Sequence, residues 1–314
     1  TQLEKSHYTF LVQDLNRYIP ELNLLLDNFN FLPSWRIDDV MASYAAPYGS
    51  VGPHTDQYDV FLIQGLGART WQINSTINSL DEKLIPDLEL RILAEFSAEE
   101  EFIMQPGDML YLPPGVQHHG LGEEPSMTYS VGFRAATQLE LLGDYIDQRT
   151  LTSCNDMRFR DGEIEADTHN GEIKLLARQR IREMIREIPS SDEDIDEWFG
   201  KFITYTGIPM ENGIPLSTDS EPTEFIEKFS SKKTLLRDPQ SRFAYIETLQ
   251  GLQLYINNES IFIDKAQSEQ IKILRLLCDQ RQYGHENMSE YLNNPATLNV
   301  LNSWWENNLI YFNE

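Results

Sequence analysis

The chain has 314 residues, with 50 acidic and 25 basic side chains and a formal net charge of −25 at pH 7. Phosphate backbones repel so acidic a protein, so we expect no direct nucleic-acid ligand and favour a basic protein as the partner. No stretch reaches the ~18–20 apolar residues of a membrane span, so we also expect no membrane contact. The alternative, that the charge serves only solubility, stays open on composition alone.

Cysteine usage bears on the compartment. Cys154 and Cys278 are the two cysteines, and their spacing suits neither a disulfide framework nor a zinc site built from cysteines. Such sparse cysteine is typical of a reducing cytosol, so we expect a cytoplasmic protein.

Residues 1–40 are predicted to be helix and loop. Leu22, Leu25, Leu26 and Phe29 recur at helical spacing, and Pro33 ends that segment.

The next block, from 40 to 134, carries the signals of short strands. The expected strands are 41–46, 58–64, 69–74, 101–104, 108–112 and 127–134, most of them separated by Gly, Pro or Asn. Between them, the acidic segment 81–100 is expected on the surface with a short helix. Many short strands at this spacing predict a sandwich or a closed barrel.

From 137 to 206 the apolar period becomes helical. Leu139, Leu142 and Tyr145 fit one helix, the segment 175–188 fits a second that Pro189 stops, and 192–202 fits a third. The apolar faces of this helical module could pack on a neighbouring domain or on a second subunit.

A segment rich in Gly, Pro, Ser and Asn, 207–221, is predicted to be a linker. Beyond it we expect helices at 225–236, 269–278 and 289–293, strands at 243–249, 252–256 and 260–263, and a helix or strand end at 299–311. Helices with a small sheet predict a winged-helix-like α+β domain, although no dense basic helix is present to fill a DNA groove.

Two histidines and one aspartate suggest a metal site. His54 and Asp56 are two residues apart where an apolar strand begins, so an extended chain puts both side chains on one face. His118 follows a Pro-Pro-Gly turn and could supply a third ligand. His119 is adjacent and faces the opposite way, so one of the two can ligate the same metal, and the residues alone leave the choice open. Two His and one carboxylate, with other positions free, are typical of non-haem iron(II) oxygenases.

A buried cation is expected next to that site. Alternation puts Arg69, Trp71 and Ile73 on one face of a strand, which would be the interior of a barrel. An arginine among apolar neighbours is costly unless an anion accompanies it, and its fork geometry suits a carboxylate. The alternative is an exposed arginine on the surface.

Four ordered motifs carry a resemblance to a known family. They are GPHTDQYDVF at 52–61, GLGARTW at 65–71, PGDMLYLPPGVQH at 106–118 and YSVGFR at 129–134. Together they resemble the Jumonji-C-type ribosomal oxygenases of the cupin superfamily, most of all the bacterial members that hydroxylate an arginine of a large-subunit ribosomal protein.

The resemblance implies a double-stranded β-helix (jelly-roll) catalytic domain at 1–136, a helical dimerisation module at 137–207 and a winged-helix-like domain at 208–314. It also implies an iron(II) ion held by His54, Asp56 and His118, with 2-oxoglutarate held by Arg69 and Ser43 and dioxygen as the oxidant. Family members have additional sequence before the position that matches Thr1, so we expect the catalytic domain to be truncated at its start.

The expected activity is hydroxylation of an arginine β-carbon in a basic ribosomal protein by a homodimer. Alternatives on the same barrel are a histidine hydroxylase or a lysine demethylase, and from another class a non-catalytic metal-binding protein. Tyr58 and Asp59 could line the substrate entrance, although Asp59 could equally be a solvated carboxylate. Arg134 is expected to be structural.

Overall fold

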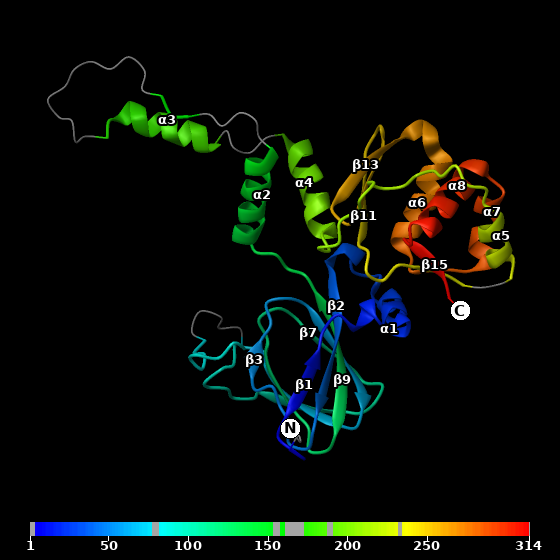
Figure 1. The fold of residues 1–314 in the computed structure, drawn as a ribbon. Coiled ribbons are helices and arrows are strands. Elements are labelled where there is room, and N and C mark those ends of the chain that lie inside the picture. The colour runs from blue at the N-terminus through cyan, green and yellow to red at the C-terminus, as the bar shows by residue number, and fades with distance from the viewer. Residues whose placement is uncertain are drawn as a thin grey trace.

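The computed structural model describes residues 4–76, 82–152, 158–160, 173–186, 191–231 and 234–313; Cys154 and Pro189 lie outside these ranges. A β barrel, a group of helices and a second α+β domain follow one another along the chain, with the N-terminus on the barrel and the C-terminus on the last domain (Figure 1).

Two antiparallel sheets form the barrel. One sheet has the order β1-β2-β9-β4-β7 and the other β3-β8-β5-β6. Their strands are β1 (Thr9–Val12), β2 (Ile37–Ala45), β3 (His54–Thr55), β4 (Val60–Leu66), β5 (Arg69–Asn74), β6 (Glu100–Met104), β7 (Met109–Leu112), β8 (Gln117–Leu121) and β9 (Ser126–Phe133). This is the predicted jelly-roll arrangement, and strands neighbouring in space are often distant in sequence.

Hydrophobic side chains fill the barrel from both sheets and cover one sheet from outside. The inner cluster includes Val60, Leu62, Trp71 and Leu112. On the outer face of the first sheet lies a cluster of Leu26, Phe29, Ile37, Val40, Phe61, Val131 and Phe133. Leu26 and Phe29 come from η2 (Leu26–Phe29), and the partly buried Leu22 and Leu25 of α1 (Pro20–Leu25) pack against the cluster, so these two helices cover the sheet from outside. The short helices η1 (Leu15–Arg17) and η3 (Ser34–Arg36) lie before and after them in the chain.

Two expectations for the barrel were wrong. Residues 9–12, predicted within helix and loop, form β1, because they pair with β2 from Thr9 opposite Ala45 to Val12 opposite Ala42. The sequence shows no alternation there, since three of the four side chains are exposed on the edge strand. The described part of 81–100 contains no helix up to β6; the segment is held by single bridges from Leu84 to Leu93 and from Ile92 to His54.

The helical group consists of α2 (Gln138–Thr152), α3 (Leu175–Arg186) and α4 (Asp192–Thr204). α2 lies beside α4, where the Trp198 indole donates to Asp144 Oδ1 at 2.7 Å. α4 also packs on the last domain: a Cβ at Gly200 would come within 2.3 Å of the Tyr255 ring, so only glycine allows this approach. α3 extends away from the rest at the left of Figure 1.

The last domain has the predicted α+β arrangement, but Leu235 and Leu236, predicted at the end of a helix, form part of β10 because they pair with β14 and β15. Its elements are α5 (Thr223–Ser230), β10 (Leu235–Arg237), β11 (Phe243–Glu247), β12 (Gly251–Ile256), β13 (Glu259–Asp264), η4 (Lys265–Gln267), α6 (Ser268–Asp279), β14 (Gln282–Tyr283), α7 (His285–Leu292), α8 (Pro295–Glu306) and β15 (Ile310–Phe312). One large core, centred on the fully buried Trp304, joins helices and strands. None of the helices among the described residues is long and apolar enough to cross a membrane.

Candidate metal centre and anion cavity

The structure brings His54, Asp56 and His118 together. β3 and β8 pair so that His54 lies directly opposite His118, and Asp56 follows β3. One potential ligand atom from each residue lies within 4.8 Å of the others. The carboxylate Oδ2 of Asp56 is 3.7 Å from His118 Nε2. This spacing suits a single metal ion between the three side chains.

Backbone carbonyls orient both imidazoles. His54 Nδ1 lies 2.9 Å from the Gly52 carbonyl and His118 Nδ1 lies 3.0 Å from the Val116 carbonyl. Each Nδ1 therefore carries the proton that it donates, which leaves the Nε2 lone pair for a metal. Burial, reinforced by the nearby His54, lowers the pKa of His118 to about 4. His118 is thus neutral at pH 7, which is the form that binds a metal.

Packing distinguishes the two adjacent histidines. His118 is almost fully buried and faces His54, with ring centroids 4.2 Å apart. The ring of His119 instead packs against Phe96, at a centroid distance of 5.9 Å.

Arg69 is buried inside the barrel, as the alternation predicted. Its side chain is 4% exposed, and burial lowers the pKa of the guanidinium to about 10, so it remains charged at pH 7. It donates to the hydroxyls of Ser43 (3.0 Å) and Ser126 (3.2 Å) and to both of their carbonyls. No carboxylate pairs with it among the described residues. Ser126 is a partner that the sequence did not single out, because a serine in a strand is usually neutral.

A cavity next to Arg69 is suited to an anion. It is lined by Thr9, Ser43, Ala45, Gly49, Ser50, Val51, Arg69, Trp71 and Gly120. Two buried polar atoms on this lining, Thr9 Oγ1 and Trp71 Nε1, have no hydrogen-bond partner among the described residues. Buried polar groups are nearly always paired, so these atoms indicate a missing polar ligand.

The inward face of β5 connects this cavity to the metal centre. The Trp71 ring lies 6.0 Å from Arg69 Cζ and 5.9 Å from the His118 ring, and Ile73 pairs with His118 across the sheet. Gly120 allows this close packing, because a Cβ there would come within 2.9 Å of the Trp71 ring. A molecule with a carboxylate at Arg69 could thus extend towards the metal.

Tyr58 and Asp59, the two residues expected at the substrate entrance, differ in their contacts. Both oxygens of Asp59 are occupied, by Arg36 Nη2 and by the Tyr111 hydroxyl, each at 2.8 Å. Arg134 has the structural role expected, since its Nε lies 2.8 Å from Asp38 Oδ1. Tyr58 instead lies next to Asp56 of the metal cluster. Burial is the main cause that raises the pKa of the Tyr58 hydroxyl, and the negative charge of Asp56 adds to it.

Asp39 lies near Tyr58 and Gly132 and was not singled out from the sequence. Its Oδ2 accepts the backbone N–H of Asp14 at 2.8 Å. Its Oδ1 and the Tyr58 ring flank Gly132, where a Cβ would lie 3.7 and 3.8 Å from them. Burial raises the pKa of Asp39, and the neighbouring acids Asp38 and Asp14 add to the effect. The local sequence does not distinguish Asp39 from Asp38, because the bulge in β2 decides which of the two side chains faces inward.

Comparison with known proteins agrees with this architecture. The JmjC domain family matches residues 24–141, and the ROXA-like winged helix family matches residues 183–311. The uL16 3-hydroxylase of Escherichia coli K12 is 32% identical over 299 residues, which cover 95% of this chain and 77% of that protein. The chain belongs to the JmjC-type ribosomal oxygenases.

Other ribosomal oxygenases align over similar lengths. A probable ribosomal oxygenase of Haemophilus influenzae is 28% identical, over 87% of this chain and 68% of its own length. The crystal structure of E. coli YcfD superposes with a TM-score of 0.77 at 30% identity, over 99% of this chain and 81% of that one. A YcfD structure that contains cobalt and 2-oxoglutarate superposes with a TM-score of 0.74 at 28% identity, over 100% and 80%.

Proposed function

We propose that this ribosomal oxygenase is an iron(II)- and 2-oxoglutarate-dependent hydroxylase that acts on the β-carbon of an arginine in a large-subunit ribosomal protein. The observation that carries the proposal is the His54–Asp56–His118 cluster joined by one strand face to the uncompensated cation of Arg69. A relative with these two domains is a uL16 3-hydroxylase, which supports the same substrate class.

The donor set fits the metal and co-substrate. Nε2 of His54 and His118 and a carboxylate oxygen of Asp56 would hold iron(II), a combination used by non-haem iron oxygenases. Arg69 would bind the distal carboxylate of 2-oxoglutarate, and Ser43 would both orient the guanidinium and donate its hydroxyl proton to that carboxylate. With iron(II) bound, 2-oxoglutarate would be oxidised to succinate and CO2, one oxygen atom of dioxygen entering succinate and the other entering the C–H bond of the substrate as a hydroxyl.

The side chains near the metal cluster favour arginine as the target residue. A guanidinium approaching the metal would pass Tyr58 and meet Oδ1 of Asp39, which has no hydrogen bond among the described residues and lies across Gly132 from that ring. A carboxylate and a guanidinium form charge-assisted hydrogen bonds, which are strengthened where water is partly excluded. The net charge of −25 would add long-range attraction for a basic ribosomal protein and would disfavour direct nucleic-acid binding.

The direct test is mass spectrometry of a uL16-type arginine peptide incubated with the protein, iron(II), ascorbate and 2-oxoglutarate. We expect arginine to gain the mass of one oxygen atom, only when 2-oxoglutarate is present. A matched peptide with histidine at the target position and one with methyl-lysine test the histidine hydroxylase and demethylase alternatives. Turnover of either of these in preference to arginine would refute the arginine assignment, and absence of all turnover with iron bound would favour a binding protein.

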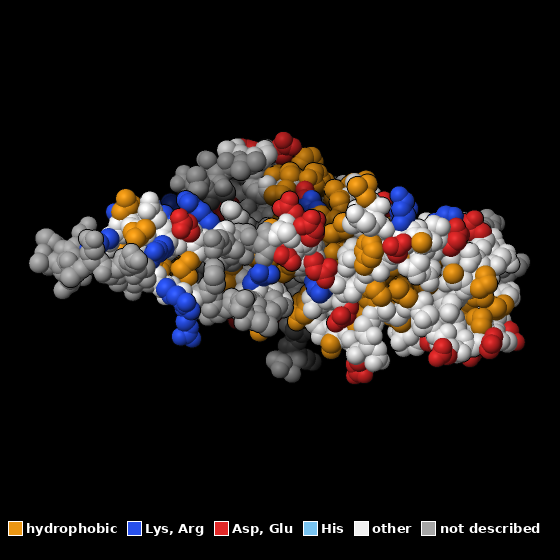
Figure 2. All heavy atoms as spheres, turned by 90° about the horizontal axis from the view of Figure 1, so that it is seen from above, with side chains coloured by type: hydrophobic (Ala, Val, Ile, Leu, Met, Phe, Trp, Pro, Cys, Tyr) orange, Lys and Arg blue, Asp and Glu red, His pale blue; other side chains and the backbone are white. Residues whose placement is uncertain are grey.

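We further propose that residues 137–207 form a dimerisation module between a catalytic domain at 1–136 and a winged-helix-like domain at 208–314, in a cytoplasmic protein. The helices leave large apolar side chains uncovered, among them Leu139 (79% exposed), Leu142 (51%) and Ile185 (61%). Hydrophobic and basic side chains lie exposed together on α3, at the left of Figure 2. Light scattering should give twice the chain mass, and Leu142→Asp with Ile185→Asp should give the single chain mass.

A further inference from the structure

The second strand of the barrel carries a bulge at Asp38 and Asp39, and Asp39 lies near Tyr58. Between Ile37 and Val40, β2 advances three residues while its partner β9 advances two. Asp38 and Asp39 are therefore the bulged residues. A bulge removes ladder hydrogen bonds and redirects side chains, and it persists only when other groups satisfy the freed backbone.

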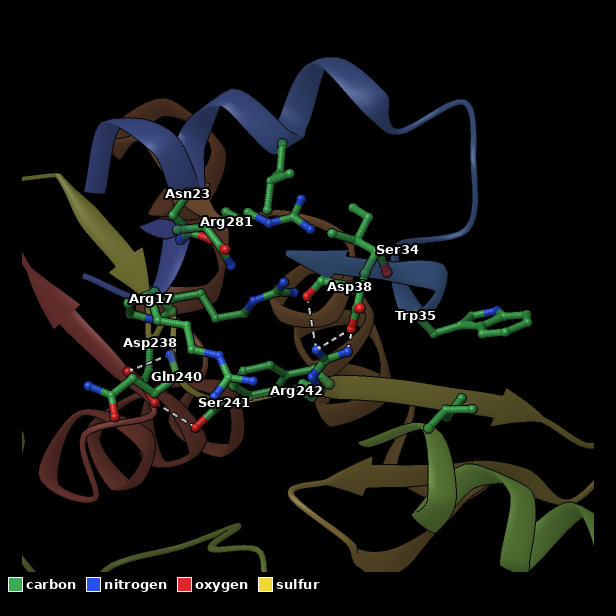
Figure 3. A pocket seen from close by; sticks show the side chains of 17 residues that line it. Arg17, Asn23, Ser34, Trp35, Asp38, Asp238, Gln240, Ser241, Arg242 and Arg281 are labelled. Atoms are coloured by element: carbon green, nitrogen blue, oxygen red, sulfur yellow. Dashed lines mark hydrogen bonds and ion pairs between the residues drawn. The ribbon is translucent and has the colours of Figure 1, made fainter. Parts of the chain in front are cut away.

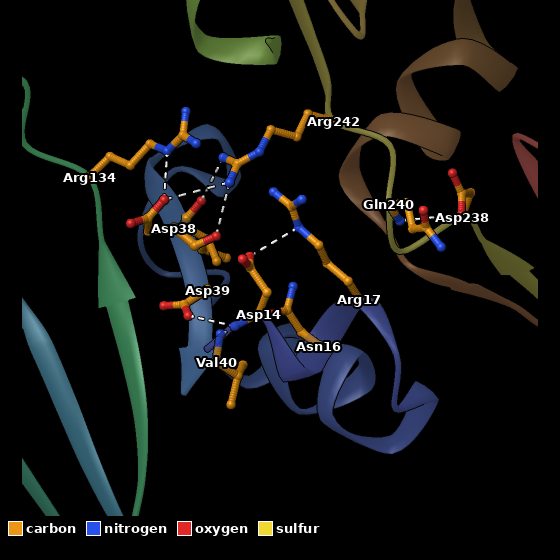
Figure 4. Close-up of polar contacts among 11 residues, drawn as sticks. Asp14, Asn16, Arg17, Asp38, Asp39, Val40, Arg134, Asp238, Gln240 and Arg242 are labelled. Carbon is orange, nitrogen blue, oxygen red and sulfur yellow. Dashed lines mark hydrogen bonds and ion pairs between the residues drawn. The ribbon is translucent and has the colours of Figure 1, made fainter. Parts of the chain in front are cut away.

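An arginine of the winged-helix domain satisfies two of those backbone groups. Arg242 Nη1 donates to the Ile37 carbonyl at 3.1 Å and Nη2 donates to the Asp38 carbonyl at 3.0 Å. The Asp38 carboxylate is 3.6 Å from the same Nη2 and 2.8 Å from Arg134 Nε. Figure 4 shows both guanidiniums converging on Asp38 from opposite sides.

The other side of the bulge is fixed by the segment before α1. Asp14 N–H donates to Asp39 Oδ2, and Val40 N–H donates to Asn16 Oδ1, both at 2.8 Å. Figure 4 shows these contacts beside the strand. The bulge is thus held between the N-terminal segment on one side and a side chain of another domain on the other.

The backbone of Arg242 is held in place by hydrogen bonds and by the core of its own domain. Its backbone exchanges hydrogen bonds with Asn257, and the next residue, Phe243, begins β11 and is buried in the domain core. Its guanidinium lies in the cavity between the two domains (Figure 3). Burial lowers the pKa of Arg242 to about 10, so the side chain donates as a cation at pH 7.

We propose that Arg242 is a positioning residue for substrate selection: by holding the Ile37–Asp38 carbonyls it fixes the bulge that presents the Asp39 carboxylate to the arginine of the substrate. This rests on the proposed function. It gives the winged-helix domain a part in the oxygenase site.

Arg281 provides a matched control. It is buried, comes from the same domain and pairs with Asp27 of the barrel domain at 2.9 Å, yet it forms no hydrogen bond or ion pair with the bulge among the described residues. Losing either arginine removes one cationic contact between the domains. Only the loss of Arg242 should disturb Asp39.

The experiment compares an arginine peptide with the same peptide carrying citrulline, its neutral isostere, at the target position. The variants are Arg242→Met, Arg242→Lys, Arg281→Met, Asp39→Asn and the double variant Arg242→Met/Asp39→Asn. Two readouts are taken: kcat/KM for hydroxylation, and equilibrium binding of the labelled peptides to the metal-free protein by fluorescence anisotropy. The KM for 2-oxoglutarate is measured in parallel.

For Arg242→Met we expect the preference for arginine over citrulline to fall about tenfold in both readouts, the effect of losing one hydrogen bond to a charged group. The KM for 2-oxoglutarate should not change, Arg242→Lys should recover part of the preference, and Arg281→Met should keep all of it. The double variant should lose no more than Asp39→Asn alone, because Arg242 acts through Asp39.

An unchanged preference in Arg242→Met, an equal loss in Arg281→Met, or additive losses in the double variant would each overturn the inference. A wild-type protein that shows no hydroxylation and no preference for arginine would instead overturn the proposed function, and this inference with it.

Discussion

Replacing Arg69 by methionine tests the anion cavity. The guanidinium uses four of its five N–H groups on Ser43 and Ser126, which leaves one N–H on Nη1 together with two serine hydroxyls for a carboxylate. Truncating one partner of a buried, hydrogen-bonded charge pair costs ~2–5 kcal/mol, so we expect a loss of about 3 kcal/mol, roughly a hundredfold in the Kd for 2-oxoglutarate.

The assay is the thermal shift that 2-oxoglutarate causes in the protein loaded with manganese(II), which supports binding without turnover. At a ligand concentration of about 100 Kd the wild-type protein gains ~2.7 kcal/mol, a rise of a few degrees in Tm. Arg69→Met itself loses four hydrogen bonds and will melt lower, so the ligand-induced shift is the quantity compared. Arg91→Met, at an arginine 70% exposed on the same domain, is the control for lost charge.

A wild-type Kd for 2-oxoglutarate in Arg69→Met would refute the cavity as the co-substrate site. Loss of manganese binding in the same variant would show that the barrel had collapsed around Arg69, and the reasoning from a local carboxylate contact would then be wrong.

The other predictions concern the metal ligands, the wall of the anion cavity and the hydrophobic core of the last domain. His118→Ala should abolish manganese(II) binding in calorimetry while His119→Ala retains it; the reverse result would exchange the two roles. Gly120→Ala should raise the KM for 2-oxoglutarate without affecting metal affinity, because the added Cβ would press on Trp71. Trp304→Ala should lower the free energy of unfolding in urea by ~3–5 kcal/mol. Trp304→Phe should lower it less, since the indole nitrogen has no partner among the described residues. Equal losses for the two variants would contradict this.

Local pattern predicted most elements of both domains. The strand at 69–74 coincides with β5, and helices expected near 192–202 and 269–278 correspond to α4 and α6. These segments have clear alternation or clear helical spacing, because one face of each is buried. β1, β3 and β8 were not among the predicted strands, because they are short and are defined by pairing with β2, with each other and with β5 rather than by a pattern of their own.

The sequence by itself determined which reactive side chains come together: the two-residue spacing puts His54 and Asp56 on one side of an extended segment, and alternation sends Arg69 inward. What it left open depended on contacts between segments far apart in the chain. Pairing of β3 with β8 placed His118, and not His119, opposite His54, and the register shift in β2 made Asp38 and Asp39 a bulge. The hydrogen bonds from Arg242 to the carbonyls of that bulge join positions more than 200 residues apart. Such contacts arise from strand register and domain packing, which no local period encodes.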